Sequence, residues 1–238
     1  MSLTLYHFNN SVCSQKVRLA LAEKGLEWDE RFVDLVKLEQ YEPDYIQLNP
    51  KGVVPTLVHD GQVVIESTLI CEYLDDTFPD PSLKPAHPSG CAAMRVWTKA
   101  VDEGIHEGVV ALSFSAMFRE RMKGMTDEQR TRQFRNIGDP VRRNRDRAVF
   151  EQGVESSYVF NAIAVYETTF SKLEKVLVDG RDWIMGDQYT LAEINFAPYV
   201  ARLEYMGLLE IWIENRPKIA AWWHRIKART AYQQGVSD

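Results

Sequence analysis

Residues 49–79 read NPKGVVPTLVHDGQVVIESTLICEYLDDTFP, and this stretch combines two strand patterns with a helix pattern. Residues 56–58 and 63–65 are short apolar runs separated by HDGQ, and Asp-Gly is among the strongest short signals for a hairpin turn. Residues 67–78 follow with apolar side chains at helical spacing. The stretch therefore predicts a β-hairpin that leads directly into a helix.

The residues before this stretch predict the remaining elements of a small sheet domain. Residues 3–8 are apolar and aromatic and predict a buried strand, and residues 14–24 predict a helix that ends at Gly25. Residues 28–34 predict a second strand. The resulting order, β-α-β, a loop, then β-β-α, is typical of an α/β unit with a mixed sheet.

The pattern changes after a segment rich in proline. Residues 80–90 contain three prolines, two serines and a glycine, which is the composition of a linker. Beyond it, strand signals largely disappear, and helical periodicity covers residues 91–118, 126–150, 155–178, 190–208 and 216–229. We therefore predict an α/β domain over residues 1–79, a linker over 80–90 and an all-helical domain over 91–238.

The composition excludes several classes of protein. The 238 residues carry a net charge of −6, so we expect no affinity for nucleic acid or for an anionic membrane. The arginine-rich residues 130–147 are interspersed with acidic ones, and we interpret them as a solvated helical connection. No apolar run is long enough to span a bilayer, and no secretory signal is visible. The three cysteines form no CxxC pair, which predicts neither a disulfide framework nor a metal site and favours the cytoplasm.

A first candidate binding feature is the pair Val54-Pro55. A proline cannot donate a ladder hydrogen bond, so it belongs at the start or edge of a strand. A cis bond at this position would leave the backbone N–H and C=O of Val54 free to pair with an extended peptide. The alternative interpretation is an ordinary loop proline.

A second candidate is Glu66-Ser67, at the step from the predicted strand to the predicted helix. Ser67 is a good helix N-cap, and a purely structural role is the simpler interpretation. Free N–H groups, a hydroxyl and the helix dipole would also suit a carboxylate, and Glu66 would suit an ammonium group. Together the two residues could hold the headgroup of an amino acid.

A third candidate is the turn between the first strand and the first helix. Ser11, Cys13 and Ser14 lie at the predicted helix N-terminus, where a thiolate would be stabilised. Ser11 could equally serve only as a helix cap. An amino-acid headgroup, an extended peptide and a thiolate are the three parts of glutathione.

The chain resembles the cytosolic glutathione transferases over nearly its full length. The matching pieces, in order, are NPKGVVPTL, ESTLICEYLDDTFP and WIMGDQYTLAEINFAPYVARL. The last resembles the folding motif of that family, with Thr190 and Glu193 as a capping box. The resemblance implies a thioredoxin-like N-terminal domain, an all-helical C-terminal domain, a homodimer, and glutathione as cosubstrate without a metal.

The resemblance also implies roles for individual residues. Val54, before a cis Pro55, would contact the cysteine backbone of glutathione, Glu66 and Ser67 would hold its γ-glutamyl end, and Gln40 would face its glycine carboxylate. Val54, Pro55, Glu66 and Ser67 stand within the matching pieces. Gln40 is assigned because many members of the family carry a polar or basic residue at that place.

Three residues compete for the catalytic position. Alignment with zeta- or omega-like members places Ser11 there, alignment with bacterial beta-like members places Cys13, and alignment with bacterial β-etherases places Ser14. A serine hydroxyl would donate a hydrogen bond to the glutathione thiolate, whereas a cysteine would form a mixed disulfide. We rank Ser11 first, Ser14 second and Cys13 third.

The likeness extends to transferases that cleave β-aryl ethers. The segments ESTLICEYLDDTFP and AAMRVWTKAVDEG and the charged stretch after MTDEQ are similar to that group. It implies that the glutathione thiolate attacks the carbon bearing an aryl ether of a small electrophile and releases a phenol. The candidate residues of the electrophile pocket are His106, Val110, Phe114 and Met117.

Two other functions compatible with the same fold stay open at this point. One is a thiol-disulfide or peroxide reductase that uses Cys13. The other is a glutathione-binding stress protein without turnover. Cys13→Ser would abolish the first activity, and tight glutathione binding without any conjugation would indicate the second.

Overall fold

The computed structural model of the protein describes residues 2–237. Its N-terminal part is a four-stranded sheet in the order β2-β1-β3-β4. Strand β1 pairs in parallel with β2 and antiparallel with β3, which forms a hairpin with β4. The strands are β1 (Leu3–His7), β2 (Asp29–Phe32), β3 (Thr56–His59) and β4 (Gln62–Ile65). The predicted mixed sheet and the Asp-Gly hairpin are confirmed.

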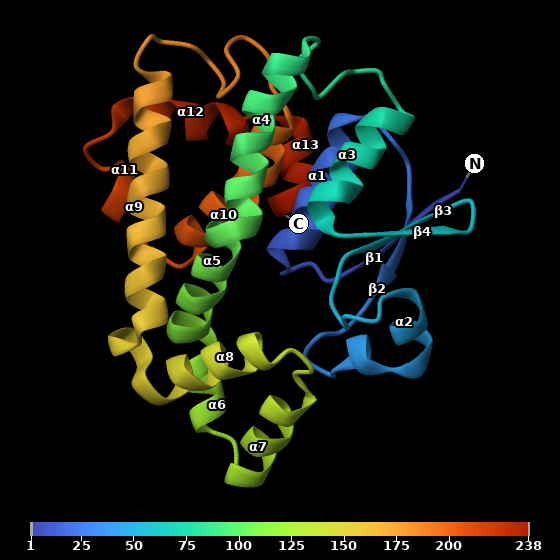
Figure 1. The fold of residues 1–238 in the computed structure, drawn as a ribbon, viewed down its shortest axis with the longest axis vertical. Coiled ribbons are helices and arrows are strands. Elements are labelled where there is room, and N and C mark those ends of the chain that lie inside the picture. Colours follow the sequence, from blue (N-terminus) through green and yellow to red (C-terminus); the bar gives the residue numbers. More distant parts are fainter. Residues whose placement is uncertain (1, 238) are drawn as a thin grey trace.

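Helices surround this sheet and join it to the second part of the chain. Figure 1 shows α1 and α3 between the sheet and the helices of the second part. The elements that accompany the sheet are α1 (Val12–Glu23), the 3₁₀ turn η1 (Glu39–Tyr41), α2 (Pro43–Leu48) and α3 (Ser67–Thr77). Helix α1 begins two residues earlier than predicted, because Ser11 caps it by accepting a hydrogen bond from the Ser14 N–H at 3.3 Å.

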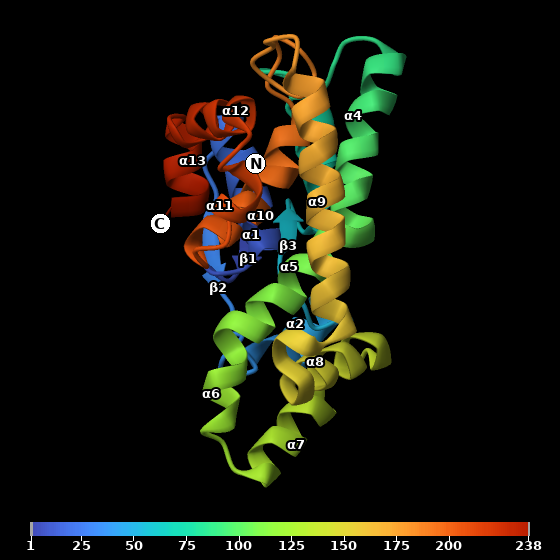
Figure 2. The same cartoon turned by 90° about the vertical axis from the view of Figure 1, so that its left-hand side faces the viewer.

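The second part is helical throughout its regular elements, as predicted. A run from residue 88 to residue 123 crosses the molecule and contains two π-helical segments, η2 and η3 (Figures 1 and 2). Its elements are α4 (Pro88–Ala100), η2 (Val101–Ile105), α5 (His106–Ser113), η3 (Phe114–Phe118) and α6 (Arg119–Lys123). Helix α4 begins inside the predicted linker, because a proline is well suited to the first helical position.

The remaining helices complete the core. They are α7 (Asp127–Asn136), α8 (Pro140–Gln152), η4 (Gly153–Glu155), α9 (Ser157–Leu177), α10 (Leu191–Tyr205), α11 (Glu210–Ile213), α12 (Pro217–Lys227), α13 (Thr230–Tyr232) and η5 (Gln233–Ser237). Helix α10 is almost entirely buried and packs against α1. One continuous apolar cluster includes side chains from both parts of the chain. The helix that carries Ser11 and Cys13 is therefore packed on the body of the second part.

The predicted capping box at the start of α10 is present. The Thr190 N–H donates to one carboxylate oxygen of Glu193 at 3.0 Å, and the Ile184 N–H donates to the other at 2.6 Å. Because Glu193 is fully buried, these backbone donors supply the hydrogen bonds that water cannot. The motif is structural and lies away from the cavity described below.

The C-terminal segment η5 lies against α1. The guanidinium of Arg18 donates from Nε and Nη2 to the carbonyl of Gly235 at 2.9 and 2.7 Å. A Cβ atom at Gly235 would come within 2.7 Å of backbone atoms of Leu19, so only glycine fits this close approach. Within residues 2–237, no helix has the length and apolar character needed to cross a membrane.

Candidate functional site

A cavity of about 530 Å³ lies between the two parts of the chain. It is lined by the N-terminus of α1, the loop before β3, the N-terminus of α3 and one side each of α5 and α8. Most of the predicted site residues meet there: Ser11, Cys13, Gln40, Val54, Pro55, Glu66, Ser67, His106, Val110 and Phe114. Segments far apart in the sequence thus form one site.

The three candidates for the catalytic position differ in their surroundings. Ser11 and Cys13 line the cavity, but Ser14 does not. Ser14 is fully buried, and its hydroxyl accepts a hydrogen bond from the Phe8 N–H at 3.4 Å. Within residues 2–237, the Ser11 hydroxyl accepts a hydrogen bond from the Ser14 N–H and donates none, so its own proton remains available for a ligand.

Cys13 belongs to a compact polar cluster. Its Sγ lies 3.6 Å from Nδ1 of His106 and 3.7 Å from the Tyr199 hydroxyl, and the last two atoms are 3.2 Å apart. Burial alone would raise the pKa of Cys13, but the His106 charge and hydrogen bond, with Lys16 and Tyr199, lower it to about 6. Burial lowers the pKa of His106, and the Cys13 thiolate outweighs this effect and raises it. The pair therefore favours thiolate and imidazolium.

A buried lysine adds positive charge beside this cluster. The Lys16 ammonium group has no exposed surface, donates to the Thr68 hydroxyl at 2.7 Å, and lies 3.6 Å from the Asp102 carboxylate. It also lies 5.9 Å from the centre of the Tyr199 ring. A buried cation requires such partners, and its field stabilises a nearby anion.

The Val54–Pro55 peptide bond is cis, and both residues line the cavity. Within residues 2–237, the backbone of Val54 makes no backbone hydrogen bond, whereas the neighbouring Val53 carbonyl accepts from Tyr45 at 2.7 Å and from Asn49 at 2.9 Å. The free N–H and C=O of Val54 can thus pair with an extended ligand.

The strand-to-helix step at Glu66 differs from the prediction. Glu66, not Ser67, occupies the N-cap position of α3, so the predicted cap role of Ser67 is wrong. Glu66 has a φ of 72°, in a region that L-residues adopt at a cost of about 1–3 kcal/mol and that is often found at binding sites. The Glu66 carboxylate lies 2.5 Å from the Lys51 ammonium. Ser67 is the first helical residue, where backbone N–H groups lack helical partners.

Gln40 also lines the cavity. It is buried in η1, and its Oε1 atom has no hydrogen-bond partner within the described residues. The two ends of an amide are interchangeable by rotation, so this side chain can offer either a donor or an acceptor. The adjacent Tyr41 hydroxyl accepts a hydrogen bond from Arg142 of α8 at 2.9 Å.

Helix α8, which lies below α5 in Figure 1, contributes three side chains to the lining of the cavity. Arg142, Arg145 and Asp146 line the site, so residues 130–147 are not only a solvated connection. Arg145 and Asp146 are both buried and form an ion pair at 2.9 Å. Burial raises the pKa of Asp146, against the opposing effect of Arg145.

Helix α5 and the segment η3 contribute apolar side chains to the cavity. Val110, Phe114 and Phe118 face the cavity together with His106 at intervals of four residues. Met117 lines neither this cavity nor the adjoining apolar one of about 460 Å³, which has Val110 and Phe114 in its wall. The π-helical segment η3 explains the difference, because its wider turn brings residue 118 to the face expected for residue 117.

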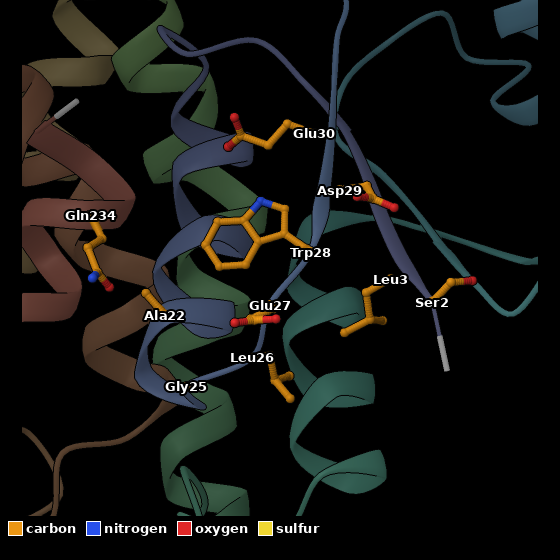
Figure 3. Close-up of a pocket in the computed structure, with 10 residues that line it drawn as sticks. All are labelled: Ser2, Leu3, Ala22, Gly25, Leu26, Glu27, Trp28, Asp29, Glu30 and Gln234. Atoms are coloured by element: carbon orange, nitrogen blue, oxygen red, sulfur yellow. The ribbon is translucent and has the colours of Figure 1, made fainter.

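Another hollow, of about 840 Å³, lies beside β2 and the end of α1. Figure 3 shows the Trp28 indole within it, with the carboxylates of Glu27, Asp29 and Glu30 around it. None of the predicted site residues lines it. Its acidic rim is unfavourable for an anion such as glutathione.

Several residues of the site were missed in the sequence. Tyr199 stands within the piece that we interpreted as a folding motif. Lys16 stands within a helix that we predicted from the spacing of its apolar side chains. The only signal for Arg142 and Arg145 was the density of arginine in residues 130–147. Nothing local indicates which face of such a helix meets a distant loop.

Comparison with known proteins agrees with this geometry. The profiles for the glutathione S-transferase N-terminal and C-terminal domains match residues 10–77 and 128–225. Protein LigF from Sphingobium sp. (strain NBRC 103272 / SYK-6) is 37% identical over 98% of this chain and 93% of its own. The tetrachloro-p-hydroquinone reductive dehalogenase of Sphingobium chlorophenolicum is 30% identical over 97% of this chain and 94% of its own.

A solved structure is similar over the same extent. The crystal structure of the β-etherase LigF from Sphingobium sp. strain SYK-6 matches with a TM-score of 0.88 at 34% identity. The match covers 100% of this chain and 99% of that chain. The likeness therefore includes both parts of the fold.

Proposed function

Because this chain belongs to the glutathione S-transferase family and is an enzyme that conjugates glutathione, we propose that its electrophile is an aromatic ether. The glutathione thiolate would attack the carbon that bears the ether oxygen. The new C–S bond replaces the C–O bond, and the aryl oxide leaves and takes up a proton. No oxidant or reductant is needed.

The cavity fits the three parts of glutathione. The free backbone of Val54 suits the cysteine residue, and the free N–H groups at Ser67 and the carboxylate of Glu66 suit the γ-glutamyl headgroup. Gln40 supplies an unpartnered amide at the other end. This arrangement directs the thiol toward Ser11 and Cys13 at the N-terminus of α1.

We assign Ser11 as the group that holds the thiol ionised. Its hydroxyl proton is available, and the N-terminus of α1 favours an anion. A hydrogen bond directed at a developing negative charge typically contributes on the order of 10²–10³-fold in rate. The predicted catalytic role of Ser14 has less support, since Ser14 is buried and does not line the cavity.

One observation carries the assignment of an aromatic ether. The apolar side chains of Val110, Phe114 and Phe118 line the same cavity as Ser11 and Cys13. An aromatic electrophile can therefore lie against the thiol. The similarity to a structure titled as a β-etherase supports the ether as its reacting group.

The test uses two readouts on one set of variants. Thiolate absorbance in the ultraviolet is followed while glutathione is titrated into the wild type, Ser11→Ala, Cys13→Ala and Ser14→Ala. Release of a fluorescent phenol from an aryl ether is then measured with the same proteins. Loss of both signals in Ser11→Ala, with glutathione still bound, supports the proposal. A wild type that conjugates simple electrophiles but releases no phenol from any aryl ether contradicts it.

A second activity is favoured by the Cys13–His106 pair. A thiolate with a pKa of about 6 is well suited to attack the sulfur of a glutathione mixed disulfide. The attack forms a disulfide between Cys13 and glutathione and displaces the other thiolate. A second glutathione thiolate then breaks this disulfide, which restores the Cys13 thiolate and releases oxidised glutathione. Cys13→Ser should abolish this exchange and leave conjugation intact. We do not propose the third hypothesis, a glutathione-binding stress protein without turnover.

We also propose a homodimer in the cytoplasm. Exposed apolar side chains on neighbouring elements, Val63 on β4, Leu69 on α3 and Val96 on α4, offer a contact face. The Glu72–Arg95 ion pair joins α3 and α4 beside it. All three cysteines are free thiols, which supports a reducing compartment.

A further inference from the structure

Helix α8 brings a buried guanidinium into the electrophile side of the cavity. Arg145 is only 5% exposed, yet it lines the same cavity as Val110 and Phe114. A buried cation is costly unless it is paired. Packing alone therefore does not explain why this charged side chain lies in the wall of the cavity.

The single ionic partner of Arg145 engages only one edge of the guanidinium. Nε donates to Oδ1 of Asp146 at 2.9 Å, and Nη2 lies 2.9 Å from the same oxygen. Arg145 makes no hydrogen bond or ion pair with any other residue in the described part of the chain. Since a guanidinium carries five N–H donors in one plane, several remain for a ligand.

The neighbouring Arg142 is engaged close to Gln40, which also lines the cavity. Its Nη2 donates to the Tyr41 hydroxyl, beside Gln40, where the glycine end of glutathione is expected. Helix α8, which carries Arg145, also packs against α5 and η3, the elements that bring His106 and Phe114 to the cavity. We therefore associate Arg145 with the side of the cavity where the electrophile is proposed to bind.

The charge of this wall favours an anion. Arg142, Arg145 and Asp146 together contribute one net positive charge to the cavity from α8. Val110 and Phe114, which line the same cavity, supply no charge. A planar guanidinium fixed by a carboxylate is the arrangement that binds carboxylates in two-point fashion.

We propose that Arg145, held by Asp146, is a specificity-determining residue that binds an acidic oxygen group on the aromatic electrophile. This inference rests on the proposed function, because it assumes that glutathione and the electrophile share this cavity. The ligand class is an aromatic compound with a carboxylate or phenolate beyond its reacting carbon. Glutathione supplies the nucleophile and is not the source of this anion.

Binding of stable conjugates tests the proposal without turnover. We would measure dissociation constants by calorimetry for S-benzylglutathione and for its ortho-, meta- and para-carboxybenzyl analogues. In the wild type, at least one carboxylated analogue should bind about tenfold tighter than S-benzylglutathione, as expected for a charge-assisted hydrogen bond in a buried site. In Arg145→Met this preference should disappear while S-benzylglutathione binds as before.

The matched control is Arg147→Met on the same helix. Arg147 is exposed and stacks over Phe134 at 5.6 Å, outside the cavity, so this variant loses the same charge and should keep the preference. Arg145→Lys should retain part of the preference, because it keeps the charge but not the planar fork. Should methionine prevent folding, Arg145→Gln repeats the test.

The outcomes separate the two proposals. A preference that is absent in the wild type, or that survives in Arg145→Met, overturns the role of Arg145. We would also compare the binding of S-benzylglutathione with that of its glycine amide. If the wild type discriminates between these two ligands and Arg145→Met does not, Arg145 binds the glycine carboxylate of glutathione and the inference is wrong. Failure of the wild type to bind any of the conjugates would instead refute the glutathione site.

Discussion

The Sγ atom of Cys13 lies 3.6 Å from Nδ1 of His106, although the two residues are 93 positions apart in the chain. Cys13 stands at the second residue of α1, and His106 opens α5. The contact therefore links the helix that we propose to support the glutathione thiol to the helix that we propose to support the electrophile. In the proposed complex, an ionisable protein thiol lies beside the thiol of the cosubstrate.

The first prediction concerns the pH dependence of Cys13 reactivity. Because the pKa of Cys13 is about 6, it should be thiolate above that pH and should lose reactivity as the pH falls below it. His106→Asn keeps a hydrogen-bonding group but removes the charge, so the pKa should rise toward the ordinary thiol value. At pH 7 the alkylation rate should then fall by more than about tenfold. The rate with iodoacetamide, measured from pH 4 to 10, checks this.

The control for this experiment is a Cys91→Ser background, so that labelling reports Cys13. Cys71 should stay unlabelled, since burial raises its pKa to about 12. A wild-type profile with its midpoint above pH 8 would show that the pair with His106 does not ionise the thiol.

The second prediction separates the two serines of the turn. Ser11→Ala should lower the rate of conjugation on the order of 10²-fold, because the glutathione thiolate loses its donor. Removal of the N-cap should also cost about 1 kcal/mol of unfolding free energy. Ser14→Ala should leave the rate unchanged and cost about 1 kcal/mol, since the Phe8 N–H loses its acceptor. Steady-state kinetics and urea unfolding of both variants provide the measurements.

The reverse pattern would overturn this assignment. If Ser14→Ala abolishes the thiolate absorbance of bound glutathione while Ser11→Ala retains it, the turn must present Ser14 to the ligand in solution.

Local signals explain why much of the fold could be predicted from the sequence. The Asp-Gly turn, the proline before β3 and the Thr190–Glu193 box each act within a few residues. The glutathione side of the site follows from such local features. Glu66 and Ser67 were correctly placed at the start of a helix, although the cap itself was assigned one residue too far along.

The electrophile side could not be predicted to the same extent. Its residues come from helices whose relative rotation depends on packing, and the π-helical segment η3 shifts the lining from Met117 to Phe118. Arg145 was hidden among other arginines, because sequence periodicity does not reveal which tertiary neighbour a charged face will meet. Tyr199 reaches Cys13 only through the packing of α10 on α1.

The third prediction concerns the stability of α10. Glu193→Gln replaces a carboxylate oxygen with an amide donor that faces backbone N–H groups, so it should lower the unfolding free energy by about 2–3 kcal/mol. Activity per folded molecule should not change, because Glu193 lies outside the cavity. Urea unfolding with active-site titration measures both. The exposed Glu214→Gln removes the same charge and should be neutral; equal effects of the two variants would contradict a role for the capping box.

The fourth prediction concerns the proposed dimer. Leu69 on α3 is 59% exposed and Val96 on α4 is 52% exposed, and a face of this kind is unfavourable in water unless it is covered. The wild type should therefore show about twice its chain mass of 27.4 kDa in light scattering. Leu69→Glu places a charge in the contact and should give the monomer mass at micromolar concentration.

Val178→Glu is the matched control for this experiment, because Val178 is also an exposed apolar residue but lies at the end of α9 and not on the proposed face. It should leave the mass unchanged. If both variants remain dimeric, another surface forms the contact; if Val178→Glu alone dissociates, the contact lies on α9. A monomeric wild type would instead show that α3 and α4 stay exposed in solution. Glutathione binding should survive in the Leu69→Glu monomer, since Leu69 does not line the cavity.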